Sequence, residues 1–290
     1  MFKGSNVALI TPFKNNKLDE DAYISLIHYH LKNGTSGLVP AGTTGESPTL
    51  SHTEHQKVIE ICIREAKGKI KVIAGTGSNS TEEAVALTKH AERAGADGAL
   101  VVTPYYNKPT QEGLFHHFKL IADSVDIDQI LYNVPGRTAV NMSVETTARL
   151  SEISNIIGIK DATGDLTIIR ELVKSCPEDF LLLTGDDATA LDFLLLGGHG
   201  GISVTANVTP KELQKVYMTA IAGNAEVARQ ANKELTNLHQ NLFLESNPIP
   251  VKWALHKMGL CSKGIRLPLL ELSSEFRPVI ENDLKELNLL

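Results

Sequence analysis

Lys160 has the sequence surroundings that best suit covalent chemistry. It ends the run IIGIK, so its side chain is expected at or near the end of a buried strand. An amine that is partly removed from water holds its proton less firmly, and a neutral amine attacks a carbonyl carbon to form a Schiff base. The alternative is an ordinary strand-end lysine that reaches solvent or pairs with Asp161.

Schiff-base chemistry also needs hydroxyl groups that move protons, and the sequence offers three. Tyr132 and Tyr106 carry phenols that can exchange protons with the carbinolamine, imine and enamine, and the Thr43 hydroxyl can link them. For each tyrosine alone, packing in the core or at a rim is the commoner role. The hypothesis therefore depends on a fold that brings these residues to Lys160.

The segment GTTGES, residues 42–47, is a glycine-flanked turn before a helix expected near His52. Its amides and hydroxyls suit a carboxylate or a phosphate. It lacks the GxxxxGK[ST] pattern of a nucleotide-binding loop, and a plain strand-to-helix turn is the alternative. Two other glycine clusters, Gly75–Gly77 and Gly197–Gly201, are interpreted as tight turns more readily than as phosphate sites.

Other reaction classes lack their motifs. His52 with His55, and His116 with His117, have no acidic third ligand at a convincing spacing, and HExxH is absent. We therefore expect no metal site. The sequence also lacks the GxSxG motif of serine hydrolases.

The elements that position these residues are short apolar runs, each nearly continuous in apolar character. Such runs are typical of parallel strands buried on both faces. We predict strands at Val7–Thr11, Gly37–Ala41, Ile70–Ala74, Ala99–Thr103, Gln129–Val134, Ile156–Lys160, Phe180–Thr184 and Gly201–Thr205.

Stretches with helical periodicity separate the runs, with polar caps such as Ser51, Ser80 and Ser143 at their starts. Eight strand–helix units fit before about residue 224, which predicts a (β/α)8 TIM barrel, an α/β fold. An open doubly wound sheet is the alternative, but it calls for a glycine fingerprint after the first strand, where TPFKNN has none. We expect residues 1–224 to form the barrel and residues 225–290 a helical extension, with helices over Ala225–Leu244, Pro250–Met258 and Glu275–Leu287.

Composition and charge narrow the class of protein. The 290 residues carry 28 basic and 34 acidic side chains, a net charge of −6, which argues against a nucleic-acid partner. The apolar run Val7–Ile10 is too short for a signal-peptide core, and no run is long enough to cross a membrane. We therefore expect no membrane partner. The three cysteines show no pattern typical of disulfides or zinc sites, so we expect the protein in the reducing cytoplasm.

GTTGES at 42–47, YNVPGRT at 132–138 and GIKDAT at 158–163 resemble the pyruvate-dependent class I aldolase family of dihydrodipicolinate synthase and N-acetylneuraminate lyase. The resemblance runs from VALITPF at 7–13 to NPIPVKWAL at 247–255. It implies a barrel with a C-terminal helical extension, a homotetramer built as a dimer of dimers, and no organic cofactor. It is strongest to members that condense pyruvate with L-aspartate 4-semialdehyde to 4-hydroxy-tetrahydrodipicolinate, the first committed step of diaminopimelate and lysine biosynthesis.

The resemblance also implies roles for single residues. Lys160 would form the Schiff base, Tyr132 would donate and accept protons, and Thr43 would complete the relay with Tyr106, which reaches a neighbouring subunit's site. Substrate-binding positions are Thr44, the Ile202 backbone, Gly185 and Arg137, whose guanidinium would bind the carboxylate of the semialdehyde.

Two other functions stay open. Sugar-acid aldolases of the family, which act on 2-keto-3-deoxy acids or N-acetylneuraminate, generally lack an arginine at position 137. A catalytically silent regulator on the same barrel would be expected to have lost Lys160 or Tyr132.

The resemblance implies a regulatory site as well. Lysine-sensitive members bind L-lysine at a subunit interface, at positions that match Ser47, Pro48, His52, His55, Asn79, Glu83 and Tyr105. Glu83 suits the α-ammonium, and Asn79 and Tyr105 suit the carboxylate. The alternative is that the histidines decorate a helix start and that Glu83 stabilises its own helix N-terminus.

Overall fold

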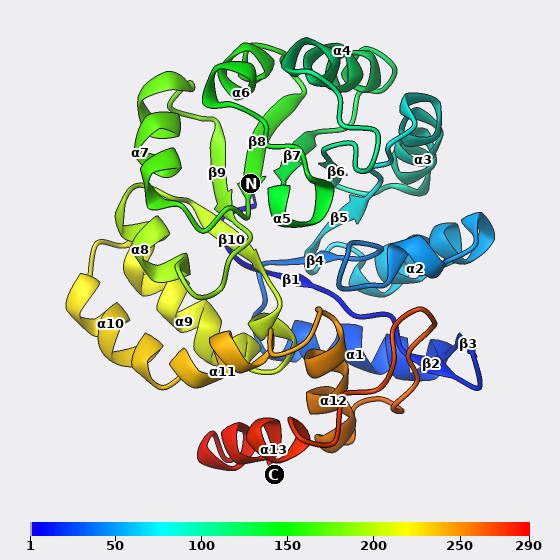
Figure 1. The fold of residues 1–290 in the computed structure, drawn as a ribbon, viewed down its shortest axis with the longest axis vertical. Helices are drawn as coiled ribbons and strands as arrows, with labels where there is room; N and C mark the ends of the chain where they lie inside the picture. The colour runs from blue at the N-terminus through cyan, green and yellow to red at the C-terminus, as the bar shows by residue number, and fades with distance from the viewer. Residues whose placement is uncertain (1) are drawn as a thin grey trace.

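The barrel predicted from the apolar runs is confirmed. The computed structural model describes residues 2–290, in which eight parallel strands close on themselves (Figure 1). β1 pairs with β4 on one side and with β10 on the other, so the barrel sheet has no free edge and the open doubly wound sheet is excluded. The barrel strands are β1 (Gly4–Ala8), β4 (Gly37–Val39), β5 (Lys71–Gly75), β6 (Gly98–Val102), β7 (Gln129–Asn133), β8 (Ile156–Asp161), β9 (Leu181–Thr184) and β10 (Gly200–Ser203).

A helix follows every barrel strand and packs on the outside. Side chains cap these helices as the sequence predicts: Ser51 and Glu54 form a reciprocal capping box, and Ser80 and Ser143 accept backbone amides of the first turn. The surrounding helices are α1 (Glu20–Lys32), α2 (His52–Ala66), α3 (Thr81–Ala94), α4 (Gln111–Ala122), α6 (Val144–Ser151), α7 (Leu166–Ser175), α8 (Ala190–Leu195) and α9 (Pro210–Ile221).

Apolar side chains fill the barrel interior. Ile73, Leu100, Ile130 and Leu183 are buried in one cluster inside the strands, and Tyr132 belongs to the same cluster. Burying a side chain such as leucine or isoleucine contributes roughly 1.5–3 kcal/mol. The barrel interior is therefore a packed apolar core, and it supports the side chains at the strand ends.

The C-terminal segment is helical, as expected, but not in one piece. The single helix predicted over Ala225–Leu244 is two helices, α10 (Ala225–Lys233) and α11 (Thr236–Asn241). They are followed by α12 (Ile249–Lys257) and α13 (Arg277–Glu286). Figure 1 shows the connection between α12 and α13 beside the hairpin at residues 13–18, where Gly264 pairs with Phe13.

The first predicted strand is displaced. β1 ends at Ala8 and not at Thr11. Leu9, Ile10 and Thr11 are buried, but they form a connecting segment and not part of the strand, and Leu9 N alone among them bonds to a barrel strand, at Val39 O (3.1 Å). A small hairpin then follows that the apolar runs did not reveal, β2 (Phe13–Lys14) with β3 (Lys17–Leu18). Its turn residues Asn15 and Asn16 both have positive φ, a backbone region that asparagine tolerates.

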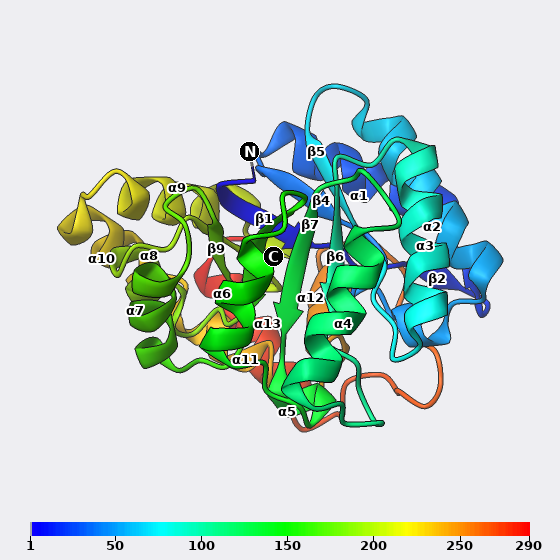
Figure 2. The same cartoon turned by 90° about the horizontal axis from the view of Figure 1, so that it is seen from above.

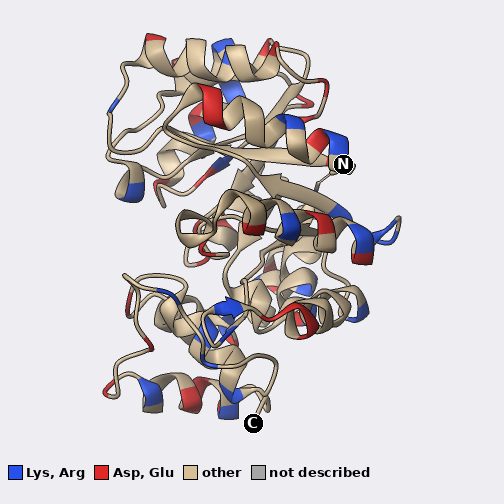
Figure 3. Ribbon diagram, turned by 90° about the vertical axis from the view of Figure 1, so that its right-hand side faces the viewer, with Lys and Arg blue, Asp and Glu red and all other residues tan. Residues whose placement is uncertain are grey.

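Charged residues of both signs are interspersed along the helices in the view of Figure 3. Over residues 2–290, no helix combines the length and the apolar character needed to cross a membrane.

Candidate active site

A cavity of about 380 Å³ opens at the carboxyl ends of the barrel strands. In Figure 2 the arrow of β7 points toward α5 (Pro135–Thr138), the short helix at this end of the barrel. Most of the predicted catalytic and substrate-binding residues come together in the wall of this cavity: Thr43, Thr44, Tyr132, Arg137, Lys160, Gly185 and Ile202.

Lys160 projects from β8 into the cavity and is only 6% exposed. Its register partner on the neighbouring strand is Tyr132, and its Nζ lies 4.0 Å from the centre of the Tyr132 ring. Within residues 2–290 no carboxylate lies within ion-pair distance of Lys160. The site therefore holds an amine beside a phenol, with no fixed counterion among the described residues.

The alternative partner, Asp161, is engaged elsewhere. Its Oδ2 accepts a bond from Asn133 Nδ2 (3.0 Å), and its Oδ1 accepts the backbone N–H and the hydroxyl of Thr163. Successive residues of a strand point to opposite faces, which separates Asp161 from the Lys160 side chain. The interpretation of Lys160 as half of a pair with Asp161 is wrong.

Gly185, directly after β9, leaves space for the Lys160 side chain. A Cβ atom at this position would lie 2.5 Å from Lys160 Cε and 2.8 Å from the Ala162 Cβ. Both distances are below those that carbon atoms tolerate. A residue with any side chain would therefore push the lysine out of its present position.

The turn at 42–47 presents Thr43 and Thr44 to the cavity. Its backbone is closed by bonds from Gly45 N to Gly42 O and from Glu46 N to Thr43 O (both 3.1 Å). The Thr44 hydroxyl accepts a bond from Asn247 Nδ2 (2.9 Å). Because that oxygen accepts from the amide, its own hydrogen is left for another acceptor such as a carboxylate.

Residues of the C-terminal segment complete the wall, and the sequence reasoning missed them. Phe243, Ser246 and Asn247 line the same cavity, and the Asn247 carbonyl accepts a bond from Arg137 Nη2 (3.3 Å). The strand-end rule for barrels directs attention to the loops after the strands. The sequence signal for these residues is the segment NPIPVKWAL, which begins at Asn247.

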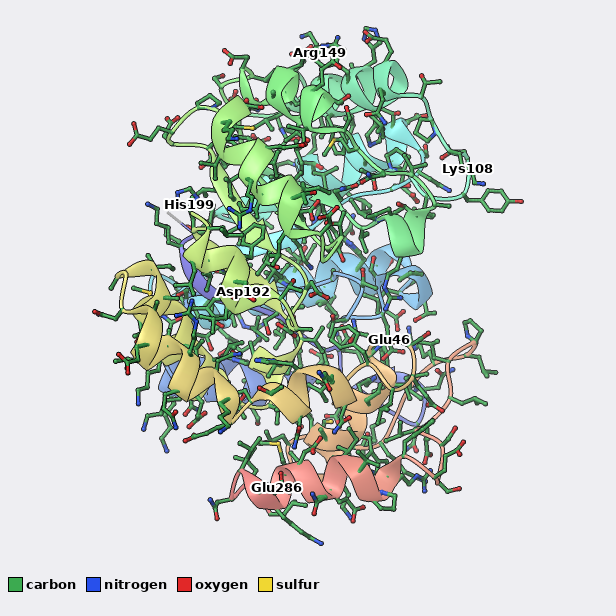
Figure 4. All side chains as sticks on the ribbon, turned by 60° about the vertical axis from the view of Figure 1, so that its left-hand side comes forward. Glu46, Lys108, Arg149, Asp192, His199 and Glu286 are labelled. Carbon is green, nitrogen blue, oxygen red and sulfur yellow. The ribbon has the colours of Figure 1, made fainter. Side chains whose placement is uncertain are left out.

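Tyr106 is not brought to the cavity. Its side chain is 90% exposed, its φ is +74°, and it lines neither this cavity nor the adjoining one. Figure 4 shows Lys108, two residues further along the same loop, at the outer edge of the molecule. Within one chain, the predicted relay therefore contains Tyr132 and Thr43 only.

A second cavity of about 400 Å³ adjoins the first and shares part of its wall, including Thr43, Tyr132 and Arg137. Six of the seven positions predicted for L-lysine line it: Ser47, Pro48, His52, His55, Glu83 and Tyr105. The seventh, Asn79, stays outside the wall and donates to the Tyr105 carbonyl (3.1 Å).

The charges of the second cavity are set by its hydrogen bonds and its burial. The Ser78 hydroxyl donates to the Glu83 carboxylate and lowers its pKa, and His52 Nε2, 2.8 Å from Glu83 Oε1, lowers it further. Burial lowers the pKa of His55 to about 4, so its ring is neutral at neutral pH. The cavity thus offers one carboxylate beside an uncharged imidazole.

The other glycine clusters serve close packing. A Cβ at Gly77 would collide with Val102, and one at Gly200 would collide with the Gly4 backbone. Both glycines let backbone segments approach each other. Gly197 lies in a turn, but Gly75 ends β5 and Gly200 lies in β10, so the interpretation of the two clusters as tight turns is wrong for these strand positions. Among residues 2–290, no three His, Cys, Asp or Glu side chains are grouped so as to hold a metal ion.

The profile of the Dihydrodipicolinate synthetase family matches residues 1–287. A 4-hydroxy-tetrahydrodipicolinate synthase of Ruthia magnifica subsp. Calyptogena magnifica is 56% identical over 288 residues, 99% of this chain and 97% of that protein.

Solved structures agree over the whole length. The chloride-inhibited dihydrodipicolinate synthase from Acinetobacter baumannii, complexed with pyruvate, is 50% identical with a TM-score of 0.99 and full coverage of both chains. The enzyme from Cyanidioschyzon merolae with lysine bound is 38% identical with a TM-score of 0.97, covering 100% of this chain and 99% of that one. From its barrel, its strand-end lysine and these similarities, the chain belongs to the dihydrodipicolinate synthetase family.

Proposed function

We propose that this chain condenses pyruvate with L-aspartate 4-semialdehyde, through a Schiff base on Lys160, to give 4-hydroxy-tetrahydrodipicolinate. The observation that carries the proposal is the buried Lys160 amine, with no carboxylate partner among the described residues, 4.0 Å from the Tyr132 ring centre. The relatives' shared name and the pyruvate complex of the Acinetobacter enzyme support the choice of substrates.

The reaction begins at the keto carbon of pyruvate. Neutral Lys160 Nζ adds to C2, proton transfers through the Tyr132 hydroxyl and Thr43 convert the carbinolamine oxygen to water, and the water leaves. The resulting iminium nitrogen acidifies the methyl group. Loss of one methyl proton gives the enamine, whose carbon is the nucleophile of the next step.

The enamine carbon then forms a bond to the aldehyde carbon of the semialdehyde, whose oxygen takes a proton to become the hydroxyl group. The substrate amine next attacks the iminium carbon and displaces Lys160 by transimination, which closes the six-membered ring. One water leaves for each product formed. Holding both substrates in one cavity of about 380 Å³ makes the ring closure intramolecular.

Substrate carboxylates fit the polar groups of the wall. We assign the pyruvate carboxylate to Thr44, whose hydroxyl hydrogen is left for an acceptor, with the Ile202 backbone beside it. Arg137, at the junction of the two cavities, suits the carboxylate of the semialdehyde through a charge-assisted bond. Gly185 keeps the space around Lys160 open.

The alternatives are not favoured. Relatives that are 53–56% identical to this chain share the synthase name, and Arg137 occupies the position where sugar-acid aldolases of the family generally lack an arginine. A catalytically silent regulator is disfavoured because Lys160 and Tyr132 are both present and adjacent.

Borohydride trapping tests the proposed chemistry. Incubation with pyruvate and borohydride is expected to add one reduced pyruvyl group per chain, located by peptide mass at Lys160. Lys160→Arg keeps a charge but loses the deprotonable amine, so the adduct should vanish and turnover should fall by orders of magnitude. Full modification of Lys160→Arg at another lysine would refute the assignment.

We further propose that the second cavity binds L-lysine as an inhibitor. The Glu83 carboxylate would receive an ammonium group of the ligand, and the Tyr105 hydroxyl would donate to its carboxylate. Asn79, outside the wall, would hold Tyr105 through its bond to the Tyr105 carbonyl. The lysine-bound relative from Cyanidioschyzon merolae supports the choice of ligand. The shared wall residues Thr43 and Tyr132 give a ligand there a short physical path to the first cavity.

We also propose that the enzyme is a homotetramer, built as a dimer of dimers, in the cytoplasm. The exposed Tyr106 supports the assembly, because a phenol held away from its own barrel can enter a neighbour's site. The free thiols Cys62, Cys176 and Cys261 suit a reducing compartment. Analytical ultracentrifugation with activity at each concentration tests this assembly, and a fully active monomer would refute the role of Tyr106.

A further inference from the structure

A carboxylate and an ammonium group are buried together beside the cavity, and the chemistry above uses neither. Glu46 and Lys252 are each 2% exposed, and Lys252 Nζ donates to Glu46 Oε1. The other carboxylate oxygen accepts the backbone N–H of Arg266 (3.0 Å). Because desolvating two charges costs about as much as their attraction returns, such a pair is weak evidence of stabilisation and calls for another reason.

The pair joins elements that are far apart in the sequence. Glu46 ends the turn after β4, whereas Lys252 lies on α12 of the C-terminal segment. Figure 4 shows Glu46 where the barrel meets the C-terminal helices. Lys252 Nζ also donates to the Thr11 carbonyl (3.0 Å), and the Thr11 hydroxyl donates to the Gly45 carbonyl (2.7 Å). The ammonium group and its partners therefore fix both Gly45 and Glu46.

The backbone of the turn needs that support. Glu46 has φ +55°, a left-handed conformation that is uncommon for a residue with a side chain. Its N–H closes the turn on the Thr43 carbonyl (3.1 Å). A change in the Glu46 conformation would therefore move Thr43 and Thr44, which line the cavity that holds Lys160.

The segment around α12 also holds the turn at a second point. Asn247, just before the helix, donates to the Thr44 hydroxyl, while Lys252 bonds to Glu46. Two contacts from one short segment leave the turn little freedom to rotate. They also explain how residues late in the chain can affect a site built from barrel strands.

We propose that Glu46 and Lys252 are a pair of positioning residues that hold Thr43 and Thr44 in register with Lys160. The inference rests on the proposed function, because Thr43 acts there in the proton relay and Thr44 on the pyruvate carboxylate. Neither member of the pair touches the substrate. Loss of the pair should therefore raise the KM for pyruvate and lower kcat, with little change in the KM for the semialdehyde, which Arg137 governs.

The test must separate positioning from stability. A single change leaves one buried charge unpaired and destabilises the fold, so the informative variant is the double one, Glu46→Gln with Lys252→Met. It removes both charges, keeps similar volumes, and leaves an amide oxygen for the Arg266 N–H. The expected result is a Tm close to that of the wild type, a pyruvate KM raised at least about tenfold, and a semialdehyde KM within about twofold.

Glu54→Gln is the matched control. Arg266 binds Glu54 through two bonds (2.9 and 2.6 Å), a second ion pair between the C-terminal segment and the barrel, located at α2. Arg266 reaches Glu46 through its backbone N–H, a donor that Glu54→Gln does not remove. The variant should lower the Tm and leave the pyruvate KM within about twofold. Glutamine keeps a side-chain oxygen for the α2 capping box.

Borohydride trapping of all three proteins separates the two proposals. A wild type that forms no pyruvate adduct overturns the proposed function and the positioning role together. The positioning role alone is overturned if the wild type forms the adduct and the double variant keeps the wild-type pyruvate KM and kcat. Equal kinetic losses in the double variant and in Glu54→Gln would show that the pair only stabilises the fold, and would also overturn the positioning role.

Discussion

At the scale of single residues, Gly185 sets how closely the loop after β9 can approach Lys160. Gly185→Ala would place a methyl group 2.5 Å from Lys160 Cε, so we expect kcat/KM for pyruvate to fall by at least about tenfold through a displaced amine. Gly136→Ala is the control, since nothing lies within 4 Å of the added Cβ although Gly136 lines the same cavity. Equal activity of the two variants would contradict the steric explanation.

Arg137 is the residue we expect to select the second substrate. Arg137→Ala should raise the KM for aspartate semialdehyde by about tenfold or more and leave borohydride trapping of pyruvate nearly unchanged, because the lost group binds only the later substrate. Arg149→Ala, which removes an exposed guanidinium outside both cavities, should change neither value. A semialdehyde KM that stays at its wild-type value, or a wild type that prefers N-acetylmannosamine, would contradict this role.

Some single residues could be predicted and others could not, for a physical reason. Lys160, Tyr132 and Thr43 follow from a general rule, because barrel strands deliver their last residues to one face. Asn247 and Lys252 obey no such rule, since their positions depend on how α12 packs back against the barrel. Tyr106 is exposed and not part of the relay within one chain, because its position depends on the conformation of its loop, which no sequence periodicity predicts.

At the scale of elements, the second cavity lies where the starts of α2 and α3 face each other. Millimolar L-lysine is expected to inhibit turnover partially, and Glu83→Ala should abolish that inhibition, because the variant removes the carboxylate that receives the ligand's ammonium. Glu82→Ala, an exposed neighbour outside the cavity wall, should retain it. Titrating the rate with lysine tests the site, and turnover that is unaffected at millimolar lysine would refute it.

Local sequence signals explain which elements were predictable. The strands were found because continuous apolar runs report burial on two faces, and the helix starts because Ser51, Ser80 and Ser143 cap them directly. The β2–β3 hairpin was missed because its strands are two residues each, too short for any periodicity. Its asparagine pair, Asn15–Asn16, was the signal that could have revealed it.

At the scale of the whole molecule, buried histidines should make stability depend on pH. Burial lowers the pKa of His30 to about 3 and the pKa values of His55 and His117 to about 4. Below pH 6.5, near the ordinary histidine pKa, these histidines bind protons in the unfolded chain but stay unprotonated in the folded chain. The free energy of unfolding therefore falls as the pH falls. The loss should be on the order of 2 kcal/mol for each histidine between pH 6.5 and pH 5.

Urea unfolding at several pH values measures this dependence. His30→Gln should flatten the slope by about one proton, because glutamine does not titrate. A wild-type free energy of unfolding that stays constant from pH 7 to pH 5 would show that these rings do not remain neutral in the folded protein.

The attachment of α12 to the turn after β4 has a consequence for how the protein is made. Ribosomes add about 5–20 residues per second, so Asn247 and Lys252 emerge several seconds after Lys160. During that interval the nascent chain carries Lys160 but lacks the contacts that hold Thr44 and Glu46. Translation products that stop before residue 247 should therefore be inactive even where their barrel has formed. The chain would become catalytically active only near the end of its synthesis.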